Sequence, residues 1–268
     1  TDPIYTRKYM KLEAEEEILL DVNELAKDYD YYQVSGISIS PDNKKMAFGV
    51  DTLSRRIYTI KVKDLGTGKM YPDKIHGVNS YTTWASDSKT MFYTGKDEQT
   101  LRSDKIFRHT LGESQDDDTL VYEEKDETFS TYVYPSKSRE YIMIGSTSTM
   151  ATEYRFLSSR TPLESFKVLQ KRERGLEYSP SHVGDMFYIS TNIDESTNFK
   201  LVKTPITSTE KSNWKDVIPH REDVLIEDTD FFNDFMVIGE RSNGLLKIRI
   251  KSWDGKEDYY LDLSLSLI

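Results

Sequence analysis

Residues 31–72, with the sequence YYQVSGISISPDNKKMAFGVDTLSRRIYTIKVKDLGTGKMYP, contain the pattern that decides the fold. Apolar residues alternate with small or polar ones over 34–39 and again over 46–50, and the turn at 40–43 (SPDN) separates the two runs, which predicts a β-hairpin. A third alternating run at 57–62 and a glycine-containing turn lead to a short, polar fourth strand. Four antiparallel strands in a row cannot bury both faces alone. The stretch therefore predicts one blade of a β-propeller.

The hairpin of this unit is repeated at a spacing of roughly 45 to 50 residues, as expected for four strands and their loops. The turn at 40–46 has copies at 85–91 and 135–141, and weaker copies precede the apolar strands at 186–190 and 235–239. Nothing indicates alternating strands and helices, and a β-sandwich, the second choice of architecture, would lack the long repeat.

The sequence therefore predicts an all-β chain that forms part of a β-propeller, with about five and a half four-stranded blades. Its expected parts are an outer half-blade at 1–29 and blades at 30–75, 76–125, 126–173, 174–222 and 223–268.

Composition limits the function classes that the chain can belong to. Its 268 residues, with 37% hydrophobic content, 18 Tyr and 11 Phe, supply enough apolar area for a globular fold. A formal net charge of −10 disfavours nucleic-acid binding, which needs a basic surface, and favours cationic partners. The absence of cysteine excludes disulfides and thiol nucleophiles and suits the cytoplasm. No apolar run approaches the roughly 20 residues that span a bilayer, so we expect no membrane contact.

Catalytic and metal-binding patterns are missing from the chain. The string GSTST at 145–149 lacks the second glycine of a Gly-x-Ser-x-Gly elbow, so a strand-end loop is the better interpretation. The acidic run at 116–118 lacks the calcium-loop spacing, and no phosphate-binding glycine cluster occurs. Metal-ligand spacing is also absent from the four histidines, His76, His109, His182 and His220. We therefore expect no catalytic residue, no metal and no cofactor. A propeller glycosidase with two facing carboxylates is a distant alternative.

The loops are more informative than the search for catalytic residues. In a propeller blade, the loops from strand two to three and from strand four to the next blade emerge on one face, and the tight hairpins emerge on the other. The first set is long and charged in this sequence, which indicates a face suited to a partner, with ordinary solvated loops as the open alternative. These charged loops are at 51–56, 96–102, 125–129, 172–175 and 219–223.

Seven strings in these strands and loops resemble, in the same order, the propeller domain of the prolyl oligopeptidase family of serine peptidases, in particular its oligopeptidase B (protease II) group. Each string alone is weak, and their order across nearly the whole chain carries the resemblance. The strings are EILLDVN (17–23), SISPDN (38–43), VDTLSRR (50–56), VYEEKD (121–126), RERGLEYS (172–179), IPHREDV (218–224) and ERSNGL (240–245).

The resemblance implies that the parent protein hydrolyses short peptides after Lys or Arg, using a Ser-Asp-His triad on an α/β-hydrolase domain that follows the propeller. Family propellers have seven blades and cap the active site. The implied function of this chain is therefore a non-catalytic cap segment that gates substrate access and is inactive alone. Its implied partners are the hydrolase domain of the same parent chain and short basic peptides.

The resemblance also implies which residues contact the hydrolase domain. Asp30 and Arg56 match, by position, family residues at or near the contact between the two domains, and both lie on the charged loop face. The candidates for this interface are Asp30, Arg55, Arg56, Arg172, Arg174, Arg221 and Glu222.

A free-standing propeller that binds protein partners is the alternative function. Such a scaffold would carry a signature of Gly-His and Trp-Asp pairs in every repeat, and these pairs do not recur here. The expected start in mid-blade also favours the cap, because we expect the inner strands of the half-blade to lie before Thr1. From the same pattern we expect the exposed edges of the first and last blades to cause self-association.

Overall fold

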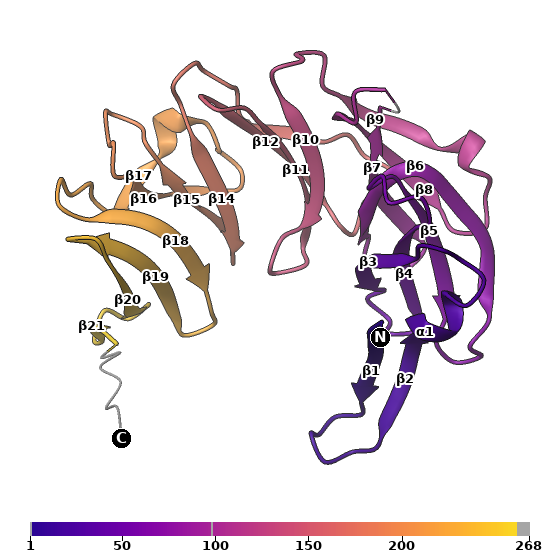
Figure 1. Cartoon of the computed structure of the whole chain (residues 1–268). Coiled ribbons are helices and arrows are strands. Elements are labelled where there is room, and N and C mark those ends of the chain that lie inside the picture. Colours follow the sequence, from indigo (N-terminus) through magenta and orange to yellow (C-terminus); the bar gives the residue numbers. More distant parts are fainter. Residues whose placement is uncertain (1, 98, 262–268) are drawn as a thin grey trace. The chain divides into compact units, whose positions relative to one another are not determined.

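The computed structural model describes residues 2–97 and 99–261, and nearly all of its regular structure is β-strand (Figure 1). Five sheets of the described residues follow one another along the chain, and neighbouring strands in each sheet are consecutive in the sequence. The prediction of an all-β chain with mostly antiparallel sheets is confirmed. No helix in the described part of the chain has the length and apolar character needed to cross a bilayer.

The first sheet is a two-stranded antiparallel hairpin of β1 (Ile4–Lys8) and β2 (Glu16–Asp21). The short helix α1 (Val22–Leu25) follows directly, and Asp21 caps it by accepting a hydrogen bond from the backbone N–H of Asn23. Apolar side chains of β2 and α1 are buried in one cluster with side chains of the next two strands.

The second sheet contains seven strands and one 3-10 helix, η1. They are β3 (Gln33–Ile39), β4 (Lys45–Asp51), β5 (Tyr58–Asp64), β6 (Met70–Trp84), β7 (Thr90–Lys96), β8 (Ser103–Thr110), η1 (Gln115–Asp117) and β9 (Thr119–Glu123). Strand β6 is fifteen residues long and changes partner along its length: its first part pairs with β5 and its last part with β7. Val78 pairs on both sides where the two parts meet. Strand β6 thus runs across the predicted blade boundary between residues 75 and 76.

Three four-stranded sheets follow in chain order (Figure 1). The third sheet consists of β10 (Ser130–Pro135), β11 (Tyr141–Thr147), β12 (Thr152–Ser158) and β13 (Lys167–Gln170). The fourth consists of β14 (Tyr178–Val183), β15 (Met186–Thr191), β16 (Lys200–Pro205) and β17 (Lys215–Ile218), with η2 (Lys211–Asn213) before β17. The fifth consists of β18 (Leu225–Phe231), β19 (Phe235–Ser242), β20 (Leu245–Ser252) and β21 (Asp258–Tyr260).

The predicted blade count and blade boundaries stay predictions. Residue 1 of the predicted half-blade, residue 98 of the second predicted blade and residues 262–268 of the last one lie outside the described residues.

The chain divides into two compact units. The first contains the residues up to Pro135 together with Arg139–Ser146 and Phe156–Lys167. The second contains Ser136–Ser138, Thr147–Arg155 and the described residues from Val168 onward.

Within each unit, apolar side chains of successive sheets are buried in shared clusters. In the first unit, Ile106 of β8 and Ile142 of β11 belong to one cluster, and both side chains are fully buried. In the second unit, Leu201 of β16 and Ile238 of β19 belong to another. Covering apolar surface contributes about 25 cal/mol per Å². Within each unit, neighbouring sheets therefore stabilise each other, as expected for sheets that cannot bury both faces alone.

Strand β3 passes very close to strand β6 at Gly36. Gly36 has a φ of +67°, which favours glycine, and a Cβ built at this position would lie 2.1 Å from the backbone oxygen of Ser80. The register between β3 and β4 shifts at the same place, between Ser35 and Ser38. Only a residue without a side chain allows this approach, which lets β6 lie against the first strand of the sheet.

We predict that Gly36→Ala destabilises the protein strongly, by more than about 3 kcal/mol, because the added methyl group collides with backbone and not with a movable side chain. Gly68→Ala is the matched control, because Gly68 has a similar φ of +73° but open space around the new atom. Its cost should be limited to the left-handed backbone, about 1–2 kcal/mol. Urea unfolding of both variants measures the difference. Equal losses of unfolding free energy would contradict the close approach.

Candidate functional site

The predicted interface residues lie in connections at one end of their own sheets. Because consecutive strands run in opposite directions, the entry to the first strand and the link from the second to the third strand are at the same end. In the first unit, Asp30 precedes β3, and Arg55 and Arg56 lie between β4 and β5. In the second unit, Arg172 and Arg174 follow β13, and Arg221 and Glu222 follow β17.

The loop between β4 and β5 is built on the carboxylate of Asp51, which is 1% exposed. One carboxylate oxygen accepts the backbone N–H of Leu53 at 2.8 Å, and the other accepts that of Arg56 at 2.7 Å. Arg55 and Arg56 are exposed at the end of this loop. Neither side chain forms a hydrogen bond or ion pair with another residue of the described chain, and the same holds for the exposed Asp30. These three charges are therefore available to a partner.

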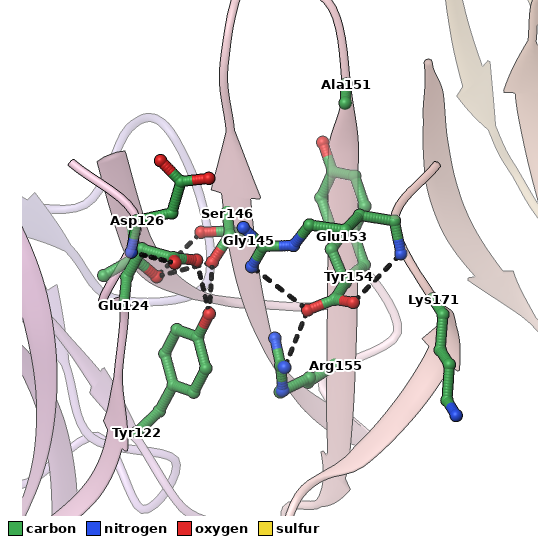
Figure 2. Close-up of polar contacts among 12 residues, drawn as sticks. Tyr122, Glu124, Asp126, Gly145, Ser146, Ala151, Glu153, Tyr154, Arg155 and Lys171 are labelled. Carbon is green, nitrogen blue, oxygen red and sulfur yellow. Dashed lines mark hydrogen bonds and ion pairs between the residues drawn. The ribbon is translucent and has the colours of Figure 1, made fainter. Parts of the chain in front are cut away.

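Arg172 has a different setting, because it belongs to an ionic cluster of the second unit with Glu153 and Arg155, the two members that Figure 2 labels. Glu153 of β12 is 5% exposed and accepts the backbone N–H of Arg172 at 3.0 Å. Its other oxygen lies 3.3 Å from the guanidinium of Arg172 and 2.7 Å from that of Arg155. Sequence reasoning did not identify Glu153, and its cluster fixes the start of the loop that carries Arg174.

Arg174 lines an open cavity of about 430 Å³ in the second unit. The loop before β14 supplies Arg174, and the loop between β15 and β16 supplies Asp194 and Glu195. Asp194 and Glu195 both have positive φ, 56° and 59°, which side-chain-bearing residues rarely adopt. Arg174 is exposed and, within the described residues, its side chain has no hydrogen bond or ion pair.

Arg221 is held by Glu240 of β19, whose side chain is fully buried. Arg221 donates to one oxygen of Glu240 at 2.5 Å, and the hydroxyl of Tyr260 donates to the other at 2.6 Å. Arg249 is a further donor at 3.4 Å. Burial alone would raise the pKa of Glu240, but the hydrogen bonds from Arg221 and Tyr260 bring it below its ordinary value. Arg221 therefore fastens the loop after β17 to the fifth sheet.

Glu222 is exposed next to this anchor. The amide of Asn198 donates to the backbone oxygens of Arg221 and Glu222 at 3.1 and 2.7 Å, which fixes the backbone and leaves the carboxylate of Glu222 free to interact. The seven candidates thus fall into two kinds. Five are exposed charges, and Arg172 and Arg221 are paired with buried carboxylates.

Ser146, in the string that was considered as a nucleophile motif, is buried inside a polar cluster of the first unit (Figure 2). It lies within β11 and donates to the hydroxyl of Tyr122 at 3.0 Å, and Tyr122 donates to Glu124 at 2.6 Å. The string at 145–149 therefore covers the end of a strand and the loop after it. This position inside a packed sheet does not offer the serine to a substrate.

His109 is the centre of a buried charge cluster that sequence reasoning missed. Its two ring nitrogens lie 2.7 Å from Asp118 and 3.0 Å from Asp73, and all three side chains are at most 3% exposed. The hydroxyl of Tyr93 also donates to Asp118. Burial alone would lower the pKa of His109, but hydrogen bonds to Asp118 and Asp73 raise it above its ordinary value. Across residues 2–97 and 99–261, no group of three His, Asp or Glu side chains is arranged to hold a metal ion.

Antiparallel sheets in chain order, packed on neighbouring sheets within each unit and with charged connections at one end, are features of a β-propeller domain. A family model described as "Prolyl oligopeptidase, N-terminal beta-propeller domain" matches residues 1–267. The chain therefore belongs to the prolyl oligopeptidase family, and the resemblance identified from the sequence is confirmed.

Two curated relatives support this assignment. Dipeptidyl aminopeptidase BI of Pseudoxanthomonas mexicana is 41% identical over 246 residues, which are 92% of this chain and 34% of the relative. Protease 2 of Moraxella lacunata is 32% identical over 253 residues, or 92% of this chain and 36% of the relative. The chain thus spans about a third of the length of these proteins.

Solved structures of oligopeptidase B are similar to the whole chain. The enzyme from Leishmania major has a TM-score of 0.89 and 28% identity over 98% of this chain and 38% of its own. The enzyme from Trypanosoma brucei, in a closed form with covalently bound antipain, has a TM-score of 0.83 and 27% identity over 95% of this chain and 35% of its own.

We predict that the His109 cluster makes stability depend on pH. Since the folded pKa of His109 is raised above 6.5, its stabilising contribution is complete below about pH 6.5 and is lost as pH rises through the folded pKa. The difference in unfolding free energy between wild type and His109→Gln should therefore shrink from pH 6 to pH 9. His76→Gln, at an exposed histidine, is the control for the loss of an imidazole and should change stability little. A difference independent of pH would contradict the charged form of His109.

We predict that Glu240→Gln lowers the unfolding free energy by about 2–4 kcal/mol, because it leaves the guanidinium of Arg221 without its buried counter-charge. The control is Glu227→Gln, which breaks a similar Glu–Arg pair with Arg241 at an exposed position and should change stability little. Guanidinium or urea titrations at one pH provide the comparison. Similar losses in both variants would show that burial of the pair does not matter.

Proposed function

We propose that this chain is part of the propeller cap of a serine oligopeptidase, where it gates the entry of short peptides to an α/β-hydrolase domain of the same parent chain. The family match over residues 1–267 carries the proposal. The chain spans about a third of its relatives, so a catalytic domain fits within the length that it does not match. A cytoplasmic location and self-association of this chain stay predictions.

The two kinds of loop residue suggest two roles in such a cap. Exposed charges without a partner in the described chain, such as Arg174 and Glu222, are suited to contact the hydrolase domain, because docking supplies the opposite charges that they lack. Arg172 and Arg221 are suited to hold their loops in shape, because they form ion pairs with the buried carboxylates of Glu153 and Glu240. The free-standing scaffold is not favoured, since the match is to the N-terminal domain of a peptidase family.

Cleavage after Lys or Arg is the specificity that we propose first, because the oligopeptidase B structures resemble the whole chain. The name of the relative that is 41% identical supports a second candidate, the release of dipeptides from a free N-terminus. Two reporter peptides with the same fluorogenic leaving group separate them in the parent protein. One has a blocked N-terminus and Arg before the scissile bond, and the other is a free dipeptide without a basic residue.

We predict that this chain alone neither hydrolyses these reporters nor reacts with a fluorophosphonate directed at active-site serines, because the nucleophile and its oxyanion donors would belong to the following domain. The parent protein should do both. Stoichiometric labelling of this chain together with turnover would contradict a purely capping role.

We predict that Arg174→Ala in the parent protein lowers kcat/KM for the preferred reporter at least tenfold, because a charge at a desolvated domain contact is costly to leave unpaired. Lys44→Ala is the control, since Lys44 is an exposed charge in the tight turn between β3 and β4, at the other end of its sheet. It should change the rate less than twofold. Equal effects of the two substitutions would place the domain contact elsewhere.

A further inference from the structure

One arginine side chain joins two charged loops of the first unit. Arg102 is the last residue of the loop between β7 and β8, and only 17% of its side chain is exposed. Its guanidinium donates to three backbone oxygens of the loop between β9 and β10: those of Glu124 and Phe129, at 2.9 Å each, and that of Asp126. Arg102 therefore belongs to one loop by sequence and holds the other by contact.

This contact needs the shape of an arginine. A guanidinium presents five N–H groups in a planar fork and can bind several oxygens at fixed angles, whereas an ammonium is a compact point charge. The carboxylate of Asp104, in β8, lies 3.9 Å from the guanidinium and balances its charge. The backbone N–H of Glu124 also donates to the backbone oxygen of Asp104 at 2.7 Å. The β9–β10 loop is thus tied both to Arg102 and to the start of β8.

The β9–β10 loop is also held in shape from within. The carboxylate of the buried Glu124 accepts the backbone N–H of Asp126 at 3.0 Å and the hydroxyl of Tyr122 at 2.6 Å (Figure 2). The carboxylate of Asp126 accepts the backbone N–H of Thr128 at 2.9 Å. Phe129 is buried at the end of the loop, and its backbone N–H donates to the backbone oxygen of Asp126 at 3.0 Å. Both acidic side chains are therefore used to fix the loop.

Lys125 and Glu127 are the two charged residues of this loop that do not hold it in shape. Both are exposed, and neither side chain forms a hydrogen bond or ion pair with another residue of the described chain. The loop therefore presents one positive and one negative charge from a backbone of fixed shape. A surface that carries one carboxylate and one cationic group is complementary to this pair.

The two loops lie at the end of the second sheet that carries predicted interface residues. Strand β8 is antiparallel to both β7 and β9, so the connections after β7 and β9 emerge at the same end of the sheet. The ammonium of Lys96, at the end of β7, donates to the backbone oxygen of Arg56 at 2.7 Å, which places the loop of Arg55 and Arg56 beside them. Lys125 and Glu127 thus add to this surface, although they are not among the seven candidates.

We propose that Arg102 is a positioning residue: it joins the β7–β8 and β9–β10 loops into one rigid element that presents Lys125 and Glu127 to the hydrolase domain of the parent protein. This inference rests on the proposed function, because a cap needs a contact that holds it over the following domain. The matching surface has a carboxylate opposite Lys125 and a cationic group opposite Glu127. A rigid loop loses little conformational freedom on docking, which favours the contact.

Hydrogen–deuterium exchange of this chain tests the link between the loops. In Arg102→Met, which keeps a long side chain but has no donor, the amides of residues 124–129 should exchange about tenfold faster than in wild type. Arg102→Lys should behave in the same way, because an ammonium lacks the planar fork. The amides of β4 should be unaffected in both variants, which separates local from global opening.

The matched control for this exchange experiment is Arg108→Met. Arg108 also donates to a backbone oxygen of the first unit, that of Pro162 at 3.3 Å, and makes no contact with the β9–β10 loop. Its replacement should leave the exchange of residues 124–129 unchanged. Equal exchange of these residues in wild type and Arg102→Met would overturn the inference.

Acylation of lysine amines measures docking without any substrate. Lys125 should react about tenfold more slowly in the parent protein than in this chain, because the hydrolase domain covers it there. Arg102→Met in the parent should remove most of this protection. Lys44, an exposed lysine in the turn between β3 and β4, is the control and should react equally in both proteins. Equal reactivity of Lys125 in the parent and in this chain would overturn the inference.

A double-mutant comparison in the parent protein tests whether Arg102 acts through the two charges. Lys125→Gln and Glu127→Gln together should lower kcat/KM for the preferred reporter about tenfold, and Arg102→Met should have a similar effect. Adding Arg102→Met to the other two substitutions should lower kcat/KM less than twofold further, because the charges that it positions are already gone. Effects that multiply independently would overturn the inference.

These experiments separate the inference from the proposed function. If the parent hydrolyses the reporters and Arg102→Met changes neither kcat/KM nor the protection of Lys125, the inference is overturned while the capping function stands. If Lys125 is protected in a parent protein that hydrolyses no peptide, and Arg102→Met removes the protection, the docking element is supported and the proposed function is removed.

Discussion

The packing of one sheet on the next is the interaction on which the rest of the structure depends. A sheet has two faces, and interior strands of the second sheet, such as β4 and β7, are buried almost throughout. The apolar clusters therefore join side chains of successive sheets, as Ile106 and Ile142 do in the first unit. A strand must fit the strands on both of its sides. Where two backbones approach closely there is no space for a side chain, and this is why glycine is required at Gly36.

The sequence predicted the strands well where apolar residues alternate, because period-two patterning follows directly from a half-buried strand. The runs at 34–39 and 46–50 lie in β3 and β4 as expected. Strand β6 shows the limit of this reasoning. Pairing with β5 and then with β7 is decided by long-range register, although Gly77, with a φ of +73°, lies beside Val78 where the partner changes. Local sequence contains no information on which edge a strand pairs with.

For the candidate site, sequence located the loops but not the partners of their charges. Arg172 and Arg221 look the same in sequence as Arg55 and Arg174, yet the first two pair with Glu153 and Glu240. These carboxylates are contributed by strands, where a glutamate in an alternating pattern is normally read as a solvent-facing residue. His109 was missed for a related reason. Asp73 and Asp118 lie 36 and 9 residues away, so no motif spacing brings the three together.

The loop face combines strong charge with local rigidity, and short aspartates supply the rigidity. Asp51, Asp97 and Asp126 each stand at the start of a charged loop and accept backbone N–H groups two to five residues later. These hydrogen bonds satisfy backbone N–H groups of the loop and hold its shape, while the side chains that follow remain in solvent. Asp51 and Asp97 bond to their own loop backbone, and within the described residues neither forms an ion pair with a neighbouring arginine or lysine. A net charge of −10 thus coexists with positively charged points on one face. Composition alone predicts cationic partners for this chain, whereas its loops also expose arginines, such as Arg56 and Arg174, that have no ion pair within the described residues.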